Sequence, residues 1–122
     1  MRSVCLIALL LAATNACAAG ATHYLDLVNT AKNSIVSFSV APIGSNRFRP
    51  MQLGDSPLQG GGESATLAIR DDGDTGCLRD LRTEFSNGRV LIQRNFDVCK
   101  YRSYHTGQYL RGQAQTVIAS MP

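Results

Sequence analysis

The sequence has little of what most enzymes and helical proteins are built from. It holds two histidines and four cysteines, with no C-x-x-C pair and no G-x-S-x-G segment. A redox dithiol, a convincing zinc site and a serine-hydrolase elbow are therefore not indicated. No window repeats apolar residues at three- and four-residue spacing between helix caps, which argues against a helical domain. The basic residues come without interleaved aromatics, which argues against nucleic acid as a partner.

The amino terminus, by contrast, has the parts of a secretory signal. Arg2 precedes an apolar run from Val4 to Ala13, and small residues follow up to Ala19. The run is too short to cross a bilayer, which takes about 20 apolar residues. We predict a signal peptide over residues 1–19 and a mature chain that starts near Ala19 or Gly20. That chain would be soluble, without a transmembrane segment, and periplasmic or secreted.

Cys17 leaves one alternative open at the cleavage site. If Cys17 were the first mature residue and were acylated, the protein would be a lipid-anchored accessory of the cell envelope. Lipoprotein signals favour Leu three positions before the cysteine, and this chain has Thr14 there. Ordinary cleavage after Ala16-Cys17-Ala18 fits the sequence better.

The remainder is long enough for one domain, which we place at residues 20–107. Short runs rich in β-branched and aromatic residues recur between turn residues, which predicts an all-β fold, a small antiparallel β-sandwich with one disulfide. The expected strands cover residues 24–28, 34–41, 64–70, 78–85 and 89–93. Residues 108–122 are expected to form a partly disordered tail.

The connection from Pro42 to Gly62 is unusually long for a small domain. Its glycines and prolines make regular structure unfavourable through much of its length. Long loops of this kind are often functional. Some of its apolar residues (Phe48, Met51, Leu53 and Leu58) are expected to cover the edge of the core.

Asn87-Gly88 indicates a hairpin between the last two strands. This dipeptide is typical of a two-residue type I′ turn. With these two residues as the loop, Phe85 would face Val90 and Leu81 would face Arg94. Leu81 and Phe85 would then share the core face of the hairpin.

The same register predicts a disulfide between Cys77 and Cys99. It brings Cys77 opposite Val98, one residue short of Cys99, and a bulge or an early exit from the ladder would join the sulfurs. Cys5 and Cys17 would leave with the signal, and the exported compartment is oxidising. The bond is expected to be structural and to stabilise the fold by about 3 kcal/mol.

One family resemblance rests on this hairpin. The stretch Cys77-Leu78-Arg79-Asp80-Leu81-Arg82, followed by Asn87-Gly88 and Asn95-Phe96-Asp97-Val98-Cys99, resembles small exported bacterial proteins of uncharacterised function. Their shared pattern is Cys-x-x-Asp-x-Arg, a turn with glycine, and Asn-x-x-x-Cys. Phe48 stands where that group has Trp, and the tail after Lys100 is longer. The resemblance implies a small β domain and no activity.

Candidate binding residues gather in the basic second half of the chain. Arg and Tyr most often carry binding energy at exposed interfaces, and five of them lie near the disulfide: Arg79, Arg82, Tyr101, Arg102 and Tyr104. We predict that they form an exposed binding surface. The alternative is that the arginines only keep a sheet face solvated, with Asp80, Arg82 and Glu84 as a row of surface ion pairs. The 42–62 loop would then be the next candidate site.

We therefore expect a non-enzymatic binding protein without a cofactor, whose partner is an unknown protein or envelope component. A small hydrolase, or an inhibitor of one, that uses His105 and the long loop remains an alternative, because triads assemble from distant residues. Asp71, Asp72 and Asp74 lack the spacing of a calcium loop. We expect them to form a solvated turn, and we predict no metal site.

Overall fold

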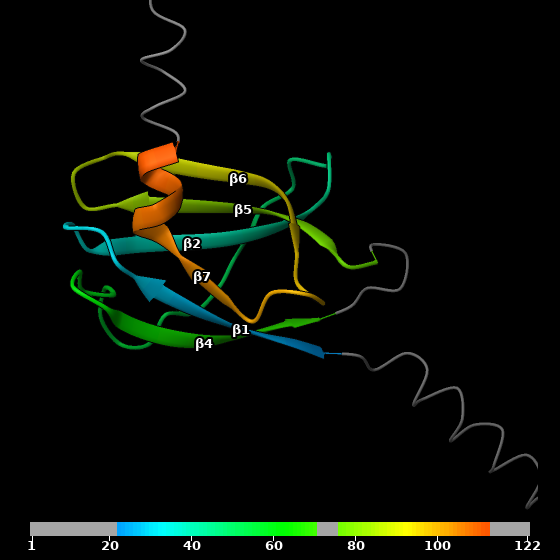
Figure 1. The fold of residues 1–122 in the computed structure, drawn as a ribbon, viewed down its shortest axis with the longest axis horizontal. Helices are drawn as coiled ribbons and strands as arrows, with labels where there is room; N and C mark the ends of the chain where they lie inside the picture. The colour runs from blue at the N-terminus through cyan, green and yellow to red at the C-terminus, as the bar shows by residue number, and fades with distance from the viewer. Residues whose placement is uncertain (1–21, 71–75, 113–122) are drawn as a thin grey trace, which may run out of the picture.

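Two β-sheets pack face to face in the computed structural model, which describes residues 22–70 and 76–112 (Figure 1). One sheet has the order β4-β1-β7 and the other the order β3-β2-β5-β6. The strands are β1 (Thr22–Asn29), β2 (Ile35–Pro42), β3 (Arg49–Pro50), β4 (Glu63–Arg70), β5 (Leu78–Phe85), β6 (Val90–Asp97) and β7 (Ser103–His105). The predicted all-β sandwich with one disulfide is confirmed.

Several predictions concern residues outside the described ranges. The signal peptide over residues 1–19, the acylation of Cys17, the turn with Asp71, Asp72 and Asp74, and residues 113–122 all lie there. Within the described ranges, no helix has the length and apolar content needed to cross a membrane.

The start of the expected tail is helical. A helix begins at residue 106 and is described as far as residue 112, so residues 108–112 are ordered. Tyr109 and Leu110 pack against the hydrophobic core from this helix. Gly107 allows the close approach, because a Cβ there would lie 2.8 Å from the carbonyl oxygen of Thr30. The helix is a single short segment with glycines, so it leaves no periodic pattern in the sequence.

Alternation along the strands supplies the core. Leu25 and Leu27 of β1 face Phe38 and other apolar side chains of the second sheet, and all three are at most 1% exposed. Tyr104 of β7 lies at the centre of an aromatic cluster, with ring centroids 4.7 Å from Tyr109 and 5.3 Å from Phe96. Such tilted and edge-to-face contacts add to the free energy of apolar burial.

Strand β7 was not predicted, and it departs from the antiparallel pattern. It pairs in parallel with β1, and Tyr104 stands beside Leu27. The amide of Asp26 donates to the carbonyl of Arg102 at 2.8 Å and so extends this ladder. Three residues are too few for the period of two to identify a strand.

The β5–β6 hairpin has a different turn from the predicted one. The amide of Phe85 donates to the carbonyl of Arg89, and the amide of Gly88 donates to the carbonyl of Phe85, both at 2.9 Å. Gly88 has a φ of 85°, whereas the φ of Asn87 is not positive. The loop is thus three residues long, a type I turn followed by a glycine bulge, and the type I′ prediction is wrong.

A second bulge restores the predicted register at the far end of the hairpin. The glycine bulge sets Leu81 opposite Gln93, one residue earlier than predicted. Asn95, with a φ of 57°, lies in the second bulge and shifts the pairing back. The amide of Val98 then donates to the carbonyl of Cys77 at 2.8 Å, the pairing that the sequence predicted.

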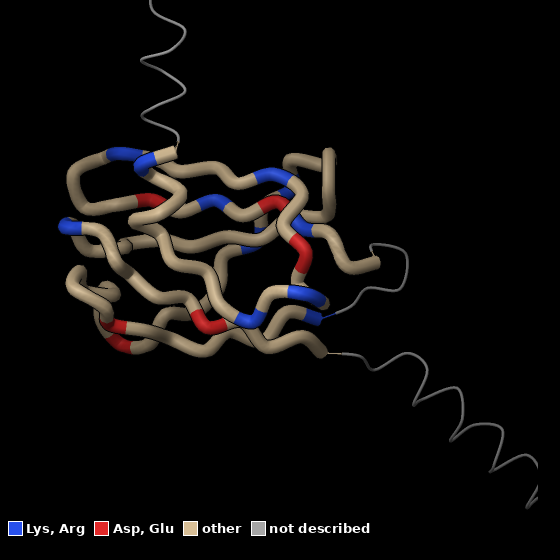
Figure 2. The backbone as a smooth tube through the Cα atoms, in the orientation of Figure 1, with Lys and Arg blue, Asp and Glu red and all other residues tan. Residues whose placement is uncertain are grey.

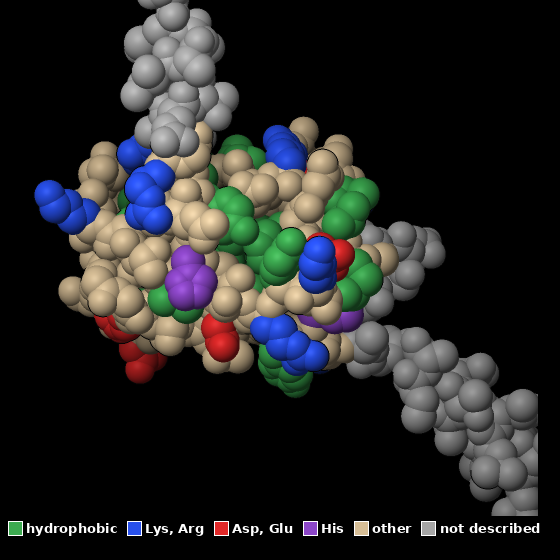
Figure 3. Space-filling model, in the orientation of Figure 1, with side chains coloured by type: hydrophobic (Ala, Val, Ile, Leu, Met, Phe, Trp, Pro, Cys, Tyr) green, Lys and Arg blue, Asp and Glu red, His purple; other side chains and the backbone are tan. Residues whose placement is uncertain are grey.

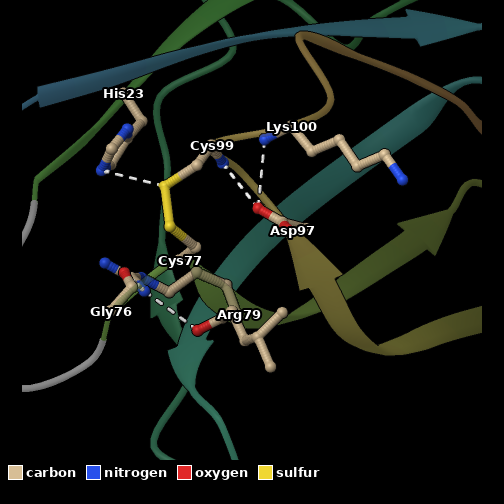
Figure 4. The surroundings of a disulfide bond; sticks show 8 residues. His23, Gly76, Cys77, Arg79, Asp97, Cys99 and Lys100 are labelled. Carbon is tan, nitrogen blue, oxygen red and sulfur yellow. Dashed lines mark hydrogen bonds between the residues drawn. A yellow bond between two sulfur atoms is a disulfide. The ribbon is translucent and has the colours of Figure 1, made fainter.

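The disulfide between Cys77 and Cys99 is confirmed (Figure 4). The two Cα atoms lie 5.3 Å apart across a sequence separation of 22. The chain leaves the ladder just before Cys99, where the carboxylate of Asp97 accepts hydrogen bonds from the amides of Cys99 and Lys100 at 3.0 and 3.1 Å. The Nε2 of His23, from β1, lies 4.0 Å from the Cys99 sulfur. The bond therefore closes the hairpin beside the other sheet.

The connection between β2 and β4 partly covers the core, as predicted. Leu58 is 3% exposed and forms an isolated bridge with Ile35. Met51 and Leu53 are partly buried against the core. The buried side chain of Asn29 holds this segment, since its amide nitrogen donates to the carbonyl of Leu58 at 2.9 Å.

Candidate functional site

The five predicted binding residues do not form one exposed surface. The side chains of Arg79 and Tyr104 are only 3% and 0% exposed, so the expectation that they lie at the surface is wrong. Arg79 occupies the same face of β5 as Leu81, and that face points into the sandwich. Tyr104 belongs to the aromatic cluster of the core.

The other three predicted residues lie on different parts of the fold. Arg82, on β5 in the larger sheet, contacts Glu84 at 3.8 Å in a partly exposed ion pair. Tyr101 and Arg102 are exposed in the connection between β6 and β7. The Lys and Arg positions are spread over the tube in Figure 2, and the face in Figure 3 mixes basic, acidic, histidine and hydrophobic side chains. A role for Arg82, Tyr101 and Arg102 in binding stays a prediction.

A cavity of about 720 Å³ includes only one of the five predicted residues, Arg79, in its lining. It is lined by the end of β2, the residues around β3, the end of β4 and the start of β5: Val40, Ala41, Pro42, Arg47, Phe48, Arg49, Met51, Ala68, Ile69, Arg70 and Arg79. Its volume lies within the range of small-molecule sites, roughly 300–1,000 Å³. Part of its wall comes from the 42–62 loop that the sequence named as the second candidate.

The strand lengths explain why the sandwich is open here. Strand β3 has two residues and covers β2 only at Ser39 and Val40. Strand β4 pairs with β1 along its whole length and lies at the edge of its own sheet. Because the edge opposite β4 is formed by so short a strand, the two sheets do not close over each other on this side.

The inner lining of the cavity is mainly apolar. Val40 and Ile69, from opposite sheets, are buried there. Phe48 and Met51, before and after β3, are half-buried. These side chains offer a surface on which an alkyl or aromatic group would lose its contact with water.

Four arginines give the cavity its charge. Arg47, Arg49 and Arg70 are exposed, while Arg79 is buried in the wall. The Nη1 of Arg79 donates to the carbonyls of Gly76 and Leu78 at 2.7 and 2.9 Å. No Asp or Glu belongs to the lining, which consists of described residues alone. The charges of the described lining are therefore all positive, and positive charge raises the local concentration of anions.

Asp80 anchors the start of the 42–62 loop, which carries Arg47. Its side chain is buried, and its carboxylate accepts hydrogen bonds from the amides of Gly44 and Asn95, both at 3.0 Å, and from Nη1 of Arg94 at 2.9 Å. Burial raises the pKa of this carboxyl, but the hydrogen bonds and the charge of Arg94 outweigh burial, so the pKa is lowered overall. The expectation that Asp80 belongs to a surface ion-pair row is wrong.

Arg94 extends the same anchor to the cavity wall. Besides Asp80, its Nη1 donates to the side-chain oxygen of Asn46 at 2.9 Å. Its guanidinium carbon also lies 6.0 Å from the centre of the Phe48 ring, a cation–π distance. Asp80 and Arg94 thus fix residues 44–48, which place Arg47 and Phe48 at the cavity. We regard the pair as positioning residues.

The other candidate chemistries gain no support from this geometry. His105 is exposed on β7 and is not part of the cavity lining. Cys77, Asp97 and Cys99 bring three potential metal-ligand atoms within 4.8 Å of one another. The two sulfurs are joined in the disulfide, however, and offer no thiolate to a metal ion.

The arginines of the cavity could not be identified as a group from the sequence. Arg47 and Arg49 flank Phe48 in the long loop. Arg70 is the last residue of β4, and Arg79 is the second residue of β5 in the other sheet. The long 42–62 loop, which the sequence named as a candidate site, pointed to Arg47 and Arg49. Alternation along β5 was a signal for Arg79, which shares the inward face with Leu81 and Phe85.

No protein family, curated protein or solved structure matches this chain. The resemblance to small exported bacterial proteins therefore stays an interpretation of the hairpin motif. The structure assigns that motif a physical role, because its cysteines form the disulfide and its Asp80 anchors the cavity loop.

Proposed function

We propose that this protein is a non-enzymatic binding protein of the periplasm or medium, and that it binds a small ligand in the cavity. The observation that carries the proposal is the cavity itself, a space of about 720 Å³ with an apolar lining and four arginines. The expected signal peptide and the disulfide support an exported location.

The lining favours binding over catalysis. It contains no His, Asp, Glu, Cys or Ser side chain among the described residues. Acid–base catalysis needs a group that exchanges a proton near neutral pH, and arginine stays protonated there. The arginines and apolar side chains of the lining can bind a ligand, but they do not exchange protons with it.

Two fluorescent probes test ligand binding in the cavity. Phenylnaphthylamine is neutral, and anilinonaphthalene sulfonate is its sulfonated counterpart. Both fluoresce strongly when they leave water for an apolar site. We expect saturable binding of at least one probe to the exported protein, with one site per chain.

A matched pair of variants locates the site. Met51→Trp places a larger side chain in the cavity and should abolish probe binding, whereas Val36→Trp adds the same ring at an exposed position on β2. Circular dichroism establishes that both variants remain folded. If neither probe binds, or if Met51→Trp binds as the original chain does, the proposed function is wrong.

A further inference from the structure

We infer that the ligand of this cavity is an amphipathic organic anion, a carboxylate, sulfonate or phosphate ester carried on an alkyl or aromatic body. The inference rests on the proposed function and adds the chemical class of the ligand. Two independent properties of the lining support it, namely its apolar area and its charge.

The apolar area calls for an organic body. The buried side chains of Val40 and Ile69 form one part of the lining, and the half-buried Phe48 and Met51 form another. An inorganic anion would fill a small part of the 720 Å³ and would touch little of this surface. An alkyl chain or an aromatic ring would remove the surface from water, at about 25 cal/mol for each Å² buried.

The charge calls for an anionic group. Guanidinium groups form paired hydrogen bonds with carboxylate and phosphate oxygens, and these bonds are stronger than bonds between neutral groups. The ion pairs within the described residues involve Arg82 and Arg94, not Arg47, Arg49 or Arg70. The guanidinium groups of these three exposed residues are thus not engaged by a carboxylate of the described part of the chain.

The stretch Arg47-Phe48-Arg49 combines both properties in one wall. The two arginines are exposed, while the ring between them is half-buried and lines the cavity. The anchor from Arg94 to Asn46 and Phe48 holds this wall in place before any ligand arrives. Such preorganisation reduces the entropy that binding must offset.

Calorimetric titration with three probes tests the inference. Octanoate carries both an alkyl chain and a carboxylate, octanol has the chain alone, and acetate has the carboxylate alone. We expect octanoate to bind the exported protein at least about tenfold more tightly than either of the others. The affinity for octanoate should fall as salt is raised, because the arginines at the opening are exposed.

Two triple variants separate the cavity charge from the net charge. Replacing Arg47, Arg49 and Arg70 by Gln should weaken octanoate binding at least about tenfold and leave octanol binding unchanged. The control replaces the exposed residues Lys32, Arg89 and Arg111 by Gln, none of which lines the cavity. It removes the same charge and should keep the original affinity for octanoate.

The outcomes distinguish this inference from the proposed function. If octanol binds as tightly as octanoate, or if both triple variants lose octanoate binding equally, the anionic class is wrong, whereas the proposed function is decided by the fluorescent probes. If acetate binds as tightly as octanoate, the apolar body is wrong. If none of these compounds and neither fluorescent probe binds, the proposed function itself fails.

Discussion

The guanidinium of Arg94 donates a hydrogen bond of 2.9 Å to the carboxylate of Asp80, and this pair connects the second bulge of the hairpin to the wall of the cavity. The Asp80 side chain is 1% exposed and the Arg94 side chain 48%. The two partners are therefore not equivalent. Asp80 also satisfies two backbone amides, from Asn95 and Gly44, whereas Arg94 can be solvated if its partner is lost.

This asymmetry predicts unequal effects of substitution. Asp80→Ala should lower the free energy of unfolding by about 2–4 kcal/mol, because it leaves buried amides without an acceptor. Arg94→Gln should cost less than Asp80→Ala, because the Arg94 side chain is half exposed and Asp80 keeps its two backbone donors when Arg94 is lost. Urea denaturation of the two variants measures both values, and equal losses would contradict the assigned roles.

The lowered pKa of Asp80 predicts a pH dependence of stability. The unfolded chain has the ordinary value of 3.8 and the folded chain a lower one. The contribution of Asp80 is therefore complete above the unfolded pKa and is lost as pH falls through the folded pKa. The difference in unfolding free energy between the original chain and Asp80→Asn should be constant above about pH 5 and should shrink below about pH 4. A difference that grows on acidification would contradict this prediction.

The disulfide should act on stability rather than on the fold. Replacement of Cys77 and Cys99 by Ala should lower the free energy of unfolding by about 3 kcal/mol. The bond joins residues that are 22 positions apart and so restricts the unfolded chain. The strand pairing of β5 and β6 does not depend on the sulfurs, so the circular dichroism spectrum should stay the same. Thiol labelling of both cysteines in the native, unreduced protein would show that the bond is absent.

Tyr104 predicts opposite results for two substitutions. Its buried hydroxyl and that of Thr83 have no partner with hydrogen-bond geometry among the described residues. Burial, and to a smaller extent Tyr109, raises the pKa of Tyr104, while Thr83 offsets part of the increase. Tyr104→Phe should leave stability unchanged or raise it by about 1 kcal/mol. Tyr104→Ala should cost about 3–5 kcal/mol, because it removes the centre of the aromatic cluster.

Thermal and urea unfolding of both Tyr104 variants provides the measurement. If Tyr104→Phe is as destabilising as Tyr104→Ala, the hydroxyl makes a bond that this account lacks. If neither variant loses stability, Tyr104 does not have the central packing role that its burial indicates.

The hairpin could be predicted from the sequence only in part. The disulfide followed from its register, yet the predicted turn was wrong, because two bulges of opposite effect restore the pairing near Cys77. Asn87-Gly88 permits both a type I′ turn and a type I turn with a glycine bulge. Which of the two turns forms depends on which cross-strand pairs pack in the core. The sequence of the turn itself does not specify these pairs.

The binding surface could be predicted less well, for two physical reasons. Arginine is usually exposed, and this general preference conflicts with the alternation that places Arg79 on the core face of β5. The cavity itself depends on the short β3 and on the sheet edge at β4, which bring Arg49 and Arg70 to one opening. Residues that meet only through the packing of two sheets share no spacing in the sequence.

The central claim is that ligand binding takes place in the arginine-lined cavity, and NMR titration of the isotopically labelled protein with octanoate tests it most directly. We predict that the largest shift changes occur at Val40, Met51 and Ile69, on the walls of the cavity. Signals of Tyr101 and Arg102, in the exposed connection before β7, should stay in place. Largest changes at Tyr101 and Arg102, or no residue-specific change at saturating octanoate, would contradict the account.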